Sequence, residues 1–451
     1  MRKFIKKIGK NWKSIIFYLL IFLLFMYEYT ILFSLNCDNI WNYGFAYNIV
    51  NGMIPYKDFN ILLFPLAPFI ISLFMKIFGT KMLVYYGVSA LFMTASIWIL
   101  NKIEKSVSPI VLIILFLFSA GGYNALLVTL ILLLIYLERN KVDDIWIGIV
   151  IGLLILTKQV MGILLIPIFM TKDLKKNIKR IMGIIIPCQF FLLYLVKNEA
   201  LYDCINYTLL ALFEFGSNNG NITFWTFIAI YIFAFWIYKY IKTKDLNCIY
   251  GLCFLAIAAP IFDMYHTCYA AIPFVIYSCA TKGKIQKFVS VFFSMLLIIY
   301  AIDKSYTEFS DKNSYYELNN DSNYYLILTK NSVVEYSNDV YQYYQSYINE
   351  YDIYFLDNNI YYVKLEHNIP INKFDLFLNG NNGYDGTNKL KEKIKNMKKK
   401  TLFIVDERVF LKKGQDKFDQ TNFELIEFVI NNYEKIDSIN EMYNVYEIVN
   451  E

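Results

Sequence analysis

The sequence has few of the residues that build metal sites and disulfides. It contains two histidines, and its seven cysteines all lie at or before Cys279. No histidine pair and no cysteine pair stands at metal-ligand spacing, which argues against a transition-metal site. Because cysteine is absent beyond Cys279, the C-terminal part has no disulfide framework. These residues therefore predict no particular cofactor. Binding of a divalent ion such as Mg²⁺ or Mn²⁺ between carboxylates stays an open alternative.

Charged residues are also scarce. They make up 18% of the 451 residues, against 57% hydrophobic residues, which is too apolar for one soluble domain. The net charge of +5 does not indicate nucleic-acid binding, because the lysines and arginines cluster at the ends of apolar segments. No small-residue cleavage pattern follows the first apolar run, so we expect it to remain as a membrane span. The composition is that of an integral membrane protein.

Long apolar runs end near Ile302, and none beyond it approaches the ~20 residues that cross a bilayer. We therefore expect a polytopic α-helical membrane domain at 1–302 and a water-facing domain at 303–451. In the second domain helix-like segments alternate with strand-like ones at 324–328, 352–356, 374–378, 401–405 and 444–449. This alternation predicts a small α/β domain with a mostly parallel sheet.

The basic clusters predict the topology. They lie at 2–13, 102–105, 139–141, 172–180, 239–244 and 282–287. If all of them face the cytoplasm, each neighbouring pair encloses an even number of crossings. This count gives about 11 spans, with the N-terminus cytoplasmic and the C-terminal domain extracytoplasmic.

Two apolar runs do not fit this topology as ordinary single spans. The run 61–78 is broken by Pro65 and Pro68, so we expect it to lie along the outer surface. The run 145–170 must cross and return with roughly 13 residues each way, about 20 Å against a ~30 Å hydrocarbon core. Its tip at Lys158 should therefore lie within the membrane domain.

An ionisable group at membrane depth is a candidate for function, because burying it is costly. Lys158 is predicted to bind an anion, most simply the phosphate of a lipid carrier; the alternative is a lysine that extends to the outer headgroups. His266, the single histidine of the membrane domain, could donate to a phosphate or a substrate hydroxyl, or be structural.

Asp38 and Asp58 lie in the polar stretch after the first span. A carboxylate beside an apolar wall can act as a general base. The alternatives are a cap of the following helix for Asp38 and a turn for Asp58.

The stretch around these aspartates resembles the first outer loop of the GT-C superfamily. These are polytopic glycosyltransferases that use polyprenyl-phosphate sugars, including protein O-mannosyltransferases and aminoarabinose transferases. The resemblance is carried by Asp38, Tyr43, Ala46, Gly52, the segment 55–59 (PYKDF), Pro65 and Phe78–Gly79, with 156–162 (LTKQVMG) as a further segment. It covers roughly residues 15–300.

The resemblance implies that Asp38 is the catalytic base, which deprotonates an acceptor hydroxyl as the sugar is transferred with inversion. Many relatives have Asp-Glu where this chain has Asp38 and Asn39, and Asp58 is the candidate for the missing carboxylate. From charge and predicted side, Lys158, Lys81 and His266 are assigned to the donor phosphate. The acceptor loops are assigned three residues: Tyr43, Tyr56 and Glu214.

The prediction is therefore a bacterial inner- or plasma-membrane glycosyltransferase that moves a sugar from a polyprenyl-phosphate carrier to an outer-face glycan, lipid or protein. Three alternatives stay open, and one of them, a non-enzymatic membrane scaffold, would leave the collection of unusual polar residues on one predicted face unexplained. A polymerase or ligase that uses lipid diphosphates would need a large outer loop rich in Arg and His, which 198–221 is not. A lipid-linked glycan transporter or flippase would show inverted repeats, and none is apparent.

Overall fold

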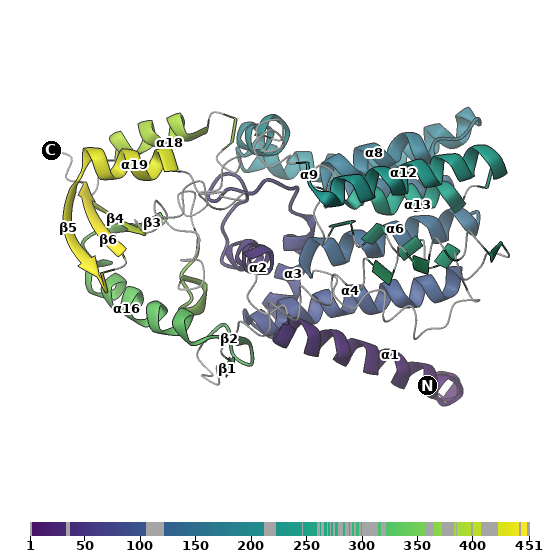
Figure 1. Cartoon of the computed structure of the whole chain (residues 1–451), viewed down its shortest axis with the longest axis horizontal. Helices are drawn as coiled ribbons and strands as arrows, with labels where there is room; N and C mark the ends of the chain where they lie inside the picture. The colour runs from purple at the N-terminus through teal and green to yellow at the C-terminus, as the bar shows by residue number, and fades with distance from the viewer. Residues whose placement is uncertain are drawn as a thin grey trace. The chain divides into compact units, whose positions relative to one another are not determined.

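The computed structural model is mostly helical (Figure 1). It describes residues 2–32, 37–104, 121–211, 222–245, 247–258, 314–316, 322–356, 364–371, 383–384, 386–397, 400–406, 423–441 and 443–448, with scattered residues from 262 to 299. The chain forms two compact units. Unit 1 comprises residues 1–39, 83–190 and 222–312, and unit 2 comprises 40–82, 191–221 and 313–451. The domain boundary near 302 stays a prediction.

The α-helices that the structure describes in unit 1 are mostly apolar. They are α1 (Arg2–Tyr27), α4 (Met82–Ile103), α6 (Gly122–Arg139), α7 (Asp144–Ile155), α8 (Gln159–Phe169), α9 (Leu174–Lys197, up to Phe190), α12 (Phe224–Thr243) and α13 (Asn247–Leu255). Among the residues that the structure describes, five segments are long and apolar enough to cross a bilayer: Trp12–Thr30, α4, α6, α9 and α12. Leucine, isoleucine and phenylalanine side chains are exposed along α1, α9 and α12, as expected for surfaces that face lipid. The chain is a multi-pass membrane protein.

Helix α7 packs directly against α9. A Cβ atom on Gly148 would overlap the carbonyl oxygen of Arg180, and one on Gly183 would overlap that of Ile145. Small residues four apart, Gly148 and Gly152, form a stripe on which α9 approaches backbone to backbone. Dispersion over this close contact replaces the hydrophobic driving force that lipid does not provide.

The described helix lengths bear on the predicted topology. Helix α3 (Leu66–Phe78) has 13 residues, about 20 Å, which is too short for a crossing. Helices α7 and α8 have 12 and 11 residues, so both arms of the expected short hairpin are shorter than a usual span. Helix α6 begins at Gly122, within the predicted break at 121–124. The total number of spans stays a prediction, because much of 105–120 and 259–313 lies outside the described residues.

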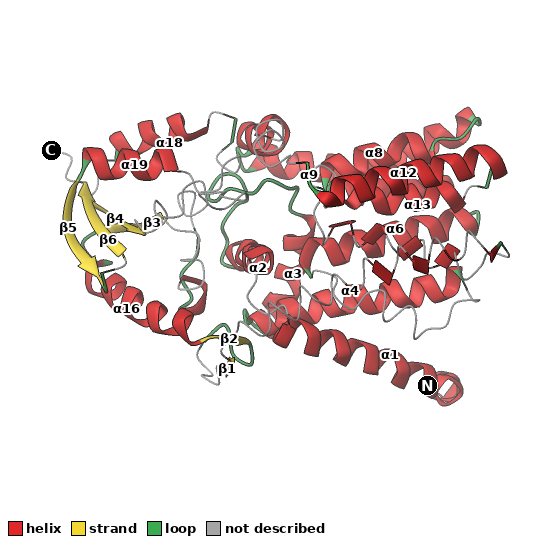
Figure 2. Ribbon diagram, viewed as in Figure 1, coloured by secondary structure: helices red, strands yellow, loops and turns green. Residues whose placement is uncertain are grey.

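Unit 2 combines the loop after the first span with the C-terminal domain. Its helices are α2 (Cys37–Val50, from Ile40 onward), α3, the last turns of α9, α10 (Leu201–Cys204), α16 (Asn331–Tyr347), α18 (Gly386–Lys395) and α19 (Phe423–Asn432). Its strands are β1 (Ser314–Tyr316), β2 (Leu328–Lys330), β3 (Asp352–Leu356), β4 (Thr401–Asp406), β5 (Glu434–Ile439) and β6 (Tyr443–Ile448). Figure 2 shows the strands in yellow.

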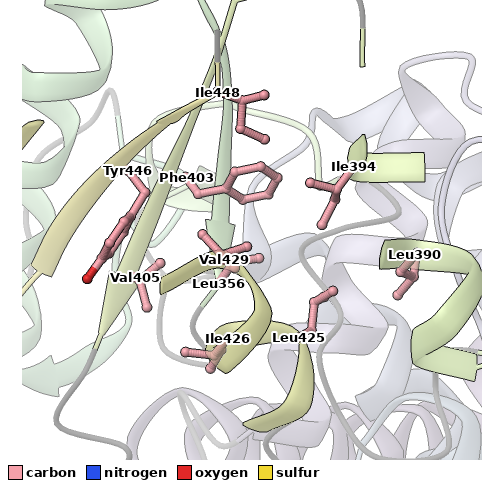
Figure 3. Packing of buried hydrophobic residues seen from close by; sticks show 10 residues of the cluster. All are labelled: Leu356, Leu390, Ile394, Phe403, Val405, Leu425, Ile426, Val429, Tyr446 and Ile448. Atoms are coloured by element: carbon pink, nitrogen blue, oxygen red, sulfur yellow. The ribbon is translucent and has the colours of Figure 1, made fainter. Parts of the chain in front are cut away.

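The C-terminal domain is a sheet with helices on both faces. The four strands are ordered β3-β4-β6-β5. Because side chains alternate along a strand, Phe403, Val405 and Ile448 pack with α18 and α19 on one face (Figure 3), whereas Leu402 and Ile404 pack with Val340 of α16 on the other. The predicted small α/β domain is present as three layers.

The predicted sheet topology was wrong in one respect. Among the strands of this sheet that the structure describes, only β3 and β4 pair in parallel, whereas β4–β6 and β6–β5 are antiparallel. Strand β5 was missed because its first five residues are all exposed, so it lacks a buried face to give alternation. The expected strand at 324–328 is mostly turn, because Leu326 has a φ of 65°, which extended backbone does not allow. The expected strand at 374–378 lies outside the described residues.

Candidate functional site

The backbone of Asp38 lies in the first turn of α2, which begins at Cys37. The helix therefore starts before the position where Asp38 would cap it. The side chain of Asp38 lies outside what the structure describes. Its neighbour Asn39 is buried, and Asn39 Oδ1 accepts a hydrogen bond from Tyr85 Oη of α4 at 3.0 Å.

A short polar chain continues from this contact to α6. Ser89, one turn after Tyr85 on α4, donates from its hydroxyl to the Tyr85 carbonyl at 3.1 Å. The same hydroxyl accepts from the backbone N–H of Gly122 at 2.9 Å. All these groups are buried, where hydrogen bonds are electrostatically stronger than in water. The network fixes the first turn of α2 against the beginnings of α4 and α6, and it was missed because a single Asn, Tyr and Ser carry no sequence pattern.

Lys158 connects α7 and α8 and is 6% exposed. Its ammonium donates to the carbonyl of Ile257 at 2.8 Å. The turn is tight, because a Cβ atom on Gly162 would overlap the backbone of Ile155. The side chain is therefore buried in protein rather than extended to headgroups, as the short hairpin predicted. Its role in binding the donor phosphate stays a prediction.

His266 also belongs to unit 1, in a helical position, and its side chain is half-buried. Glu214, which we assigned to the acceptor loops, lies outside the described residues.

Asp58 closes a turn in unit 2. Its Oδ2 accepts from the backbone N–H of Ile54 at 2.7 Å, and its own N–H donates to the Ile54 carbonyl at 2.9 Å. Tyr56 lies inside this turn with a φ of 71°. These contacts support the alternative in which Asp58 shapes the loop. A catalytic role for Asp58 is still a prediction, and Asp38 and Asp58 belong to different compact units.

The two tyrosines of this loop are buried and donate to backbone carbonyls. Tyr43 Oη donates to Thr80 at 2.8 Å, and Tyr56 Oη donates to Leu63 at 2.8 Å. Burial raises the pKa of Tyr43 and of Tyr56 well above the ordinary value. Both phenols are therefore neutral donors at physiological pH, and both stabilise the loop. Their predicted contact with an acceptor is not tested by these bonds.

Lys81 lies beside the carbonyl to which Tyr43 donates. Its ammonium donates to the carbonyl of Ser322 at 2.7 Å, and the next residue, Met82, donates from its N–H to Asn323 at 2.9 Å. The structure thus brings Tyr43 and Lys81 together, at the beginning of the C-terminal domain. Phosphate binding by Lys81 stays a prediction.

Within the described part of the chain, no group of three or more His, Cys, Asp or Glu side chains could hold a metal ion. The possibility of Mg²⁺ or Mn²⁺ therefore stays a prediction made from the sequence.

The architecture defined by these units is a polytopic helical membrane domain with a small α/β C-terminal domain. No model of a known protein family matches the chain, and no curated protein sequence matches it. Among solved structures, it is similar to ArnT from Cupriavidus metallidurans in the apo state, with a TM-score of 0.51 and 10% identity. That similarity covers 97% of this chain and 98% of ArnT.

A second similar structure is the Archaeoglobus fulgidus oligosaccharyltransferase in complex with zinc and sulfate. It has a TM-score of 0.43 and 12% identity, over 95% of this chain and 72% of that one. The fold expected from the loop after the first span is confirmed, since the chain shares the fold of ArnT over nearly the whole of both chains.

Proposed function

We propose that the protein is a membrane glycosyltransferase that transfers a sugar from a polyprenyl-phosphate carrier to an acceptor hydroxyl. The observation that carries the proposal is the fold shared with ArnT over nearly the whole of both chains. A fold alone does not define chemistry, and two particular residues add support. Asp38 lies in a turn that is fixed by Asn39 and Tyr85, and Lys158 is a buried cation in the same unit.

In the proposed reaction, the acceptor oxygen forms a bond to the anomeric carbon as the bond from that carbon to the phosphate oxygen breaks. The acceptor proton passes to the carboxylate of Asp38, and the polyprenyl phosphate leaves with the bonding electron pair. Attack opposite to the leaving group inverts the anomeric configuration. A positioned general base of this kind contributes ~10² to 10⁴ in rate.

The ammonium of Lys158 is proposed to stabilise the charge that grows on the leaving phosphate. A fixed cation in a site that excludes water is worth more than the same cation in solvent. The carbonyl of Ile257 holds this ammonium in place, which removes part of the entropic cost of positioning a lysine side chain. His266 is proposed as a second donor to the phosphate or to a substrate hydroxyl.

The remaining partners follow from the same proposal. The donor is a polyprenyl-phosphate sugar, and the acceptor is a glycan, a lipid or a protein at the outer face of a bacterial inner or plasma membrane. The N-terminus is proposed to be cytoplasmic and the C-terminal domain extracytoplasmic.

The test is an assay of the purified protein with polyprenyl-phosphate sugars and a panel of acceptors. Asp38→Asn should lose transfer by roughly a hundredfold or more, whereas Glu350→Gln, an exposed carboxylate in the C-terminal domain, should not change it. Equal transfer by the wild type and Asp38→Asn would remove Asp38 from the mechanism. Absence of transfer with every carrier-linked sugar, in protein that is folded, would contradict the proposed activity itself.

A further inference from the structure

A pocket in unit 1 has no part in the proposed reaction. Its volume is about 310 Å³, within the range of small-ligand sites. The ends of α4 and α6, the middle of α12 and the length of α13 line it, together with Pro273, Ile276 and Tyr277. Apolar side chains make up most of the wall, and its charged and aromatic residues include Glu104, Arg139, Trp236, Asp245, Tyr250 and Tyr277.

A buried lysine lies next to residues that line this pocket. Lys239 follows Trp236 by one turn of α12 and is 6% exposed. Its ammonium lies 5.5 Å from the ring centre of Tyr277, which lines the pocket, and 5.9 Å from that of Phe235. Among the residues that the structure describes, no carboxylate or other hydrogen-bond acceptor lies on this ammonium. Two aromatic faces offset only part of the cost of burying a charge, so an anion is expected nearby.

A second cation enters the wall of the pocket from α6. The guanidinium of Arg139 lies over the ring of Tyr250 at 5.7 Å, and its Nη1 donates to the Ile103 carbonyl at 3.2 Å. Its Nη2 donates to the side chain of Asn247. Three contacts from two other helices, α4 and α13, thus hold a planar donor group in the wall, and such a group suits a phosphate.

The pocket also carries negative charge. Glu104 follows the end of α4, and Asp245 precedes α13, where its Oδ1 accepts from the N–H of Asn247 at 2.9 Å. Two carboxylates and the rings of Trp236, Tyr250 and Tyr277 are the surroundings that an organic ammonium prefers. Cations and carboxylates therefore share one pocket, among apolar side chains.

We propose that this pocket binds the headgroup of a membrane aminophospholipid, of the phosphatidylethanolamine type. Its phosphate contacts Lys239 and Arg139, and its ammonium contacts Glu104, Asp245 and the aromatic rings. An amine and a phosphate in one ligand match the two signs of charge, and the apolar walls match its acyl chains. The site is separate from the residues of the proposed transfer reaction, so the two can be tested independently.

The experiment uses the full chain purified in detergent, with native mass spectrometry and thermal unfolding in the presence of added lipid. Phosphatidylethanolamine should be retained and should raise the unfolding temperature more than phosphatidylglycerol, which lacks the amine, or phosphatidylcholine, whose quaternary ammonium cannot donate hydrogen bonds. Lys239→Met and Glu104→Gln should each weaken retention of phosphatidylethanolamine by about tenfold, because each removes a charge-assisted contact.

The matched control is Lys242→Met, which removes an exposed lysine from the same helix and should leave lipid retention unchanged. Glu104→Gln keeps the test valid if Lys239→Met does not fold. Equal retention of all three lipids, or unchanged retention of phosphatidylethanolamine in both variants, would overturn the proposal. Free phosphoethanolamine that binds as tightly as the lipid would also overturn it, because the ligand would then be a soluble metabolite.

Discussion

Asn48 and Ile371 exchange two hydrogen bonds although 323 residues separate them in the sequence. Asn48 Nδ2 donates to the Ile371 carbonyl at 2.7 Å, and the Ile371 N–H donates to Asn48 Oδ1 at 3.1 Å. Asn48 lies on α2, and both residues are fully buried. The helix after the first span and the C-terminal domain are thus parts of one folded unit.

Asn48→Ala should destabilise this unit by about 2 to 4 kcal/mol, because it leaves a buried N–H and a buried C=O of Ile371 without their partner. Thermal unfolding in detergent, together with limited proteolysis of the segment around 364–371, measures the effect. Asn51→Ala is the control, since Asn51 is exposed just after the end of the same helix and its side chain donates to the carbonyl of Tyr47, within the helix. Equal losses of unfolding temperature in the two variants would show that the hydrogen bonds between Asn48 and Ile371 do not stabilise the unit more than the exposed bond of Asn51.

Tyr85→Phe should lower transfer activity through the position of Asp38. It removes the donor to Asn39 and keeps the ring, so the first turn of α2 loses one buried hydrogen bond worth about 1.5 kcal/mol. A loss of that size at the transition state is roughly tenfold in kcat. We expect the KM for the donor to change less than kcat, since the contact orients a base and does not touch the carrier.

Variants of Asn39, the acceptor for Tyr85, distinguish an effect on the position of Asp38 from a general loss of stability. Asn39→Asp keeps an acceptor for Tyr85 and should retain more activity than Asn39→Ala. A fall in unfolding temperature with unchanged kcat in Tyr85→Phe would show that the bond is structural only.

Arg180 joins the ends of several helices in unit 1. Its side chain is 3% exposed, and its guanidinium contacts Glu138 at 2.8 Å, Asp144 at 2.7 Å and the Phe169 carbonyl. Removing one member of a buried charge network leaves the others uncompensated, which costs about 3 to 5 kcal/mol. Arg180→Gln should therefore lower the unfolding temperature strongly.

The neighbouring lysine provides the control for Arg180. Lys179 pairs with Asp143 at 2.8 Å, but both side chains are about half exposed. Exposed pairs contribute little, so Lys179→Gln should leave the unfolding temperature nearly unchanged. Equal unfolding temperatures for Arg180→Gln and Lys179→Gln would contradict the proposed weight of the buried Arg180 network.

Gly148→Ala should separate α7 from α9, because the new methyl group would overlap the carbonyl of Arg180, which is backbone and cannot rotate away. Overpacking of this kind costs about 1 to 3 kcal/mol. Gly87→Ala in α4 should instead raise the unfolding temperature. The nearest atom to a new Cβ there is Met26 Sδ at 4.0 Å, and alanine favours a helix. Unfolding temperatures of the two variants in the same detergent test this difference.

The expected helices and strands were found where the signal is local. The runs that form α4, α12 and β4 have length and hydropathy that do not depend on their neighbours. The two short arms around Lys158 followed from counting residues between basic clusters. Strand β5 and the turn at 322–326 did not follow, because the first has no buried face over most of its length and the second depends on backbone strain at Leu326.

For the candidate site, the sequence indicated which residues carry charge but not what they contact. Lys81 and Lys158 both appeared as cations on the predicted outer side, and the structure gives each a backbone carbonyl from a distant segment. Lys239 was grouped with the basic residues of a helix end, yet it is buried between aromatic rings. Exposure of a lysine depends on what packs around it, which a one-dimensional charge pattern does not contain.

The sequence by itself determined that this is a multi-pass membrane protein with a small α/β domain at its C-terminal end, because hydropathy and periodicity are properties of contiguous segments. Only the tertiary structure decided that the first loop and that domain form one unit, that β6 pairs antiparallel with both its neighbours, and that Asn39 is held by Tyr85. Each of these depends on a contact between residues far apart in the chain. Such contacts form because buried polar groups must find partners, and only the folded chain determines which partners those are.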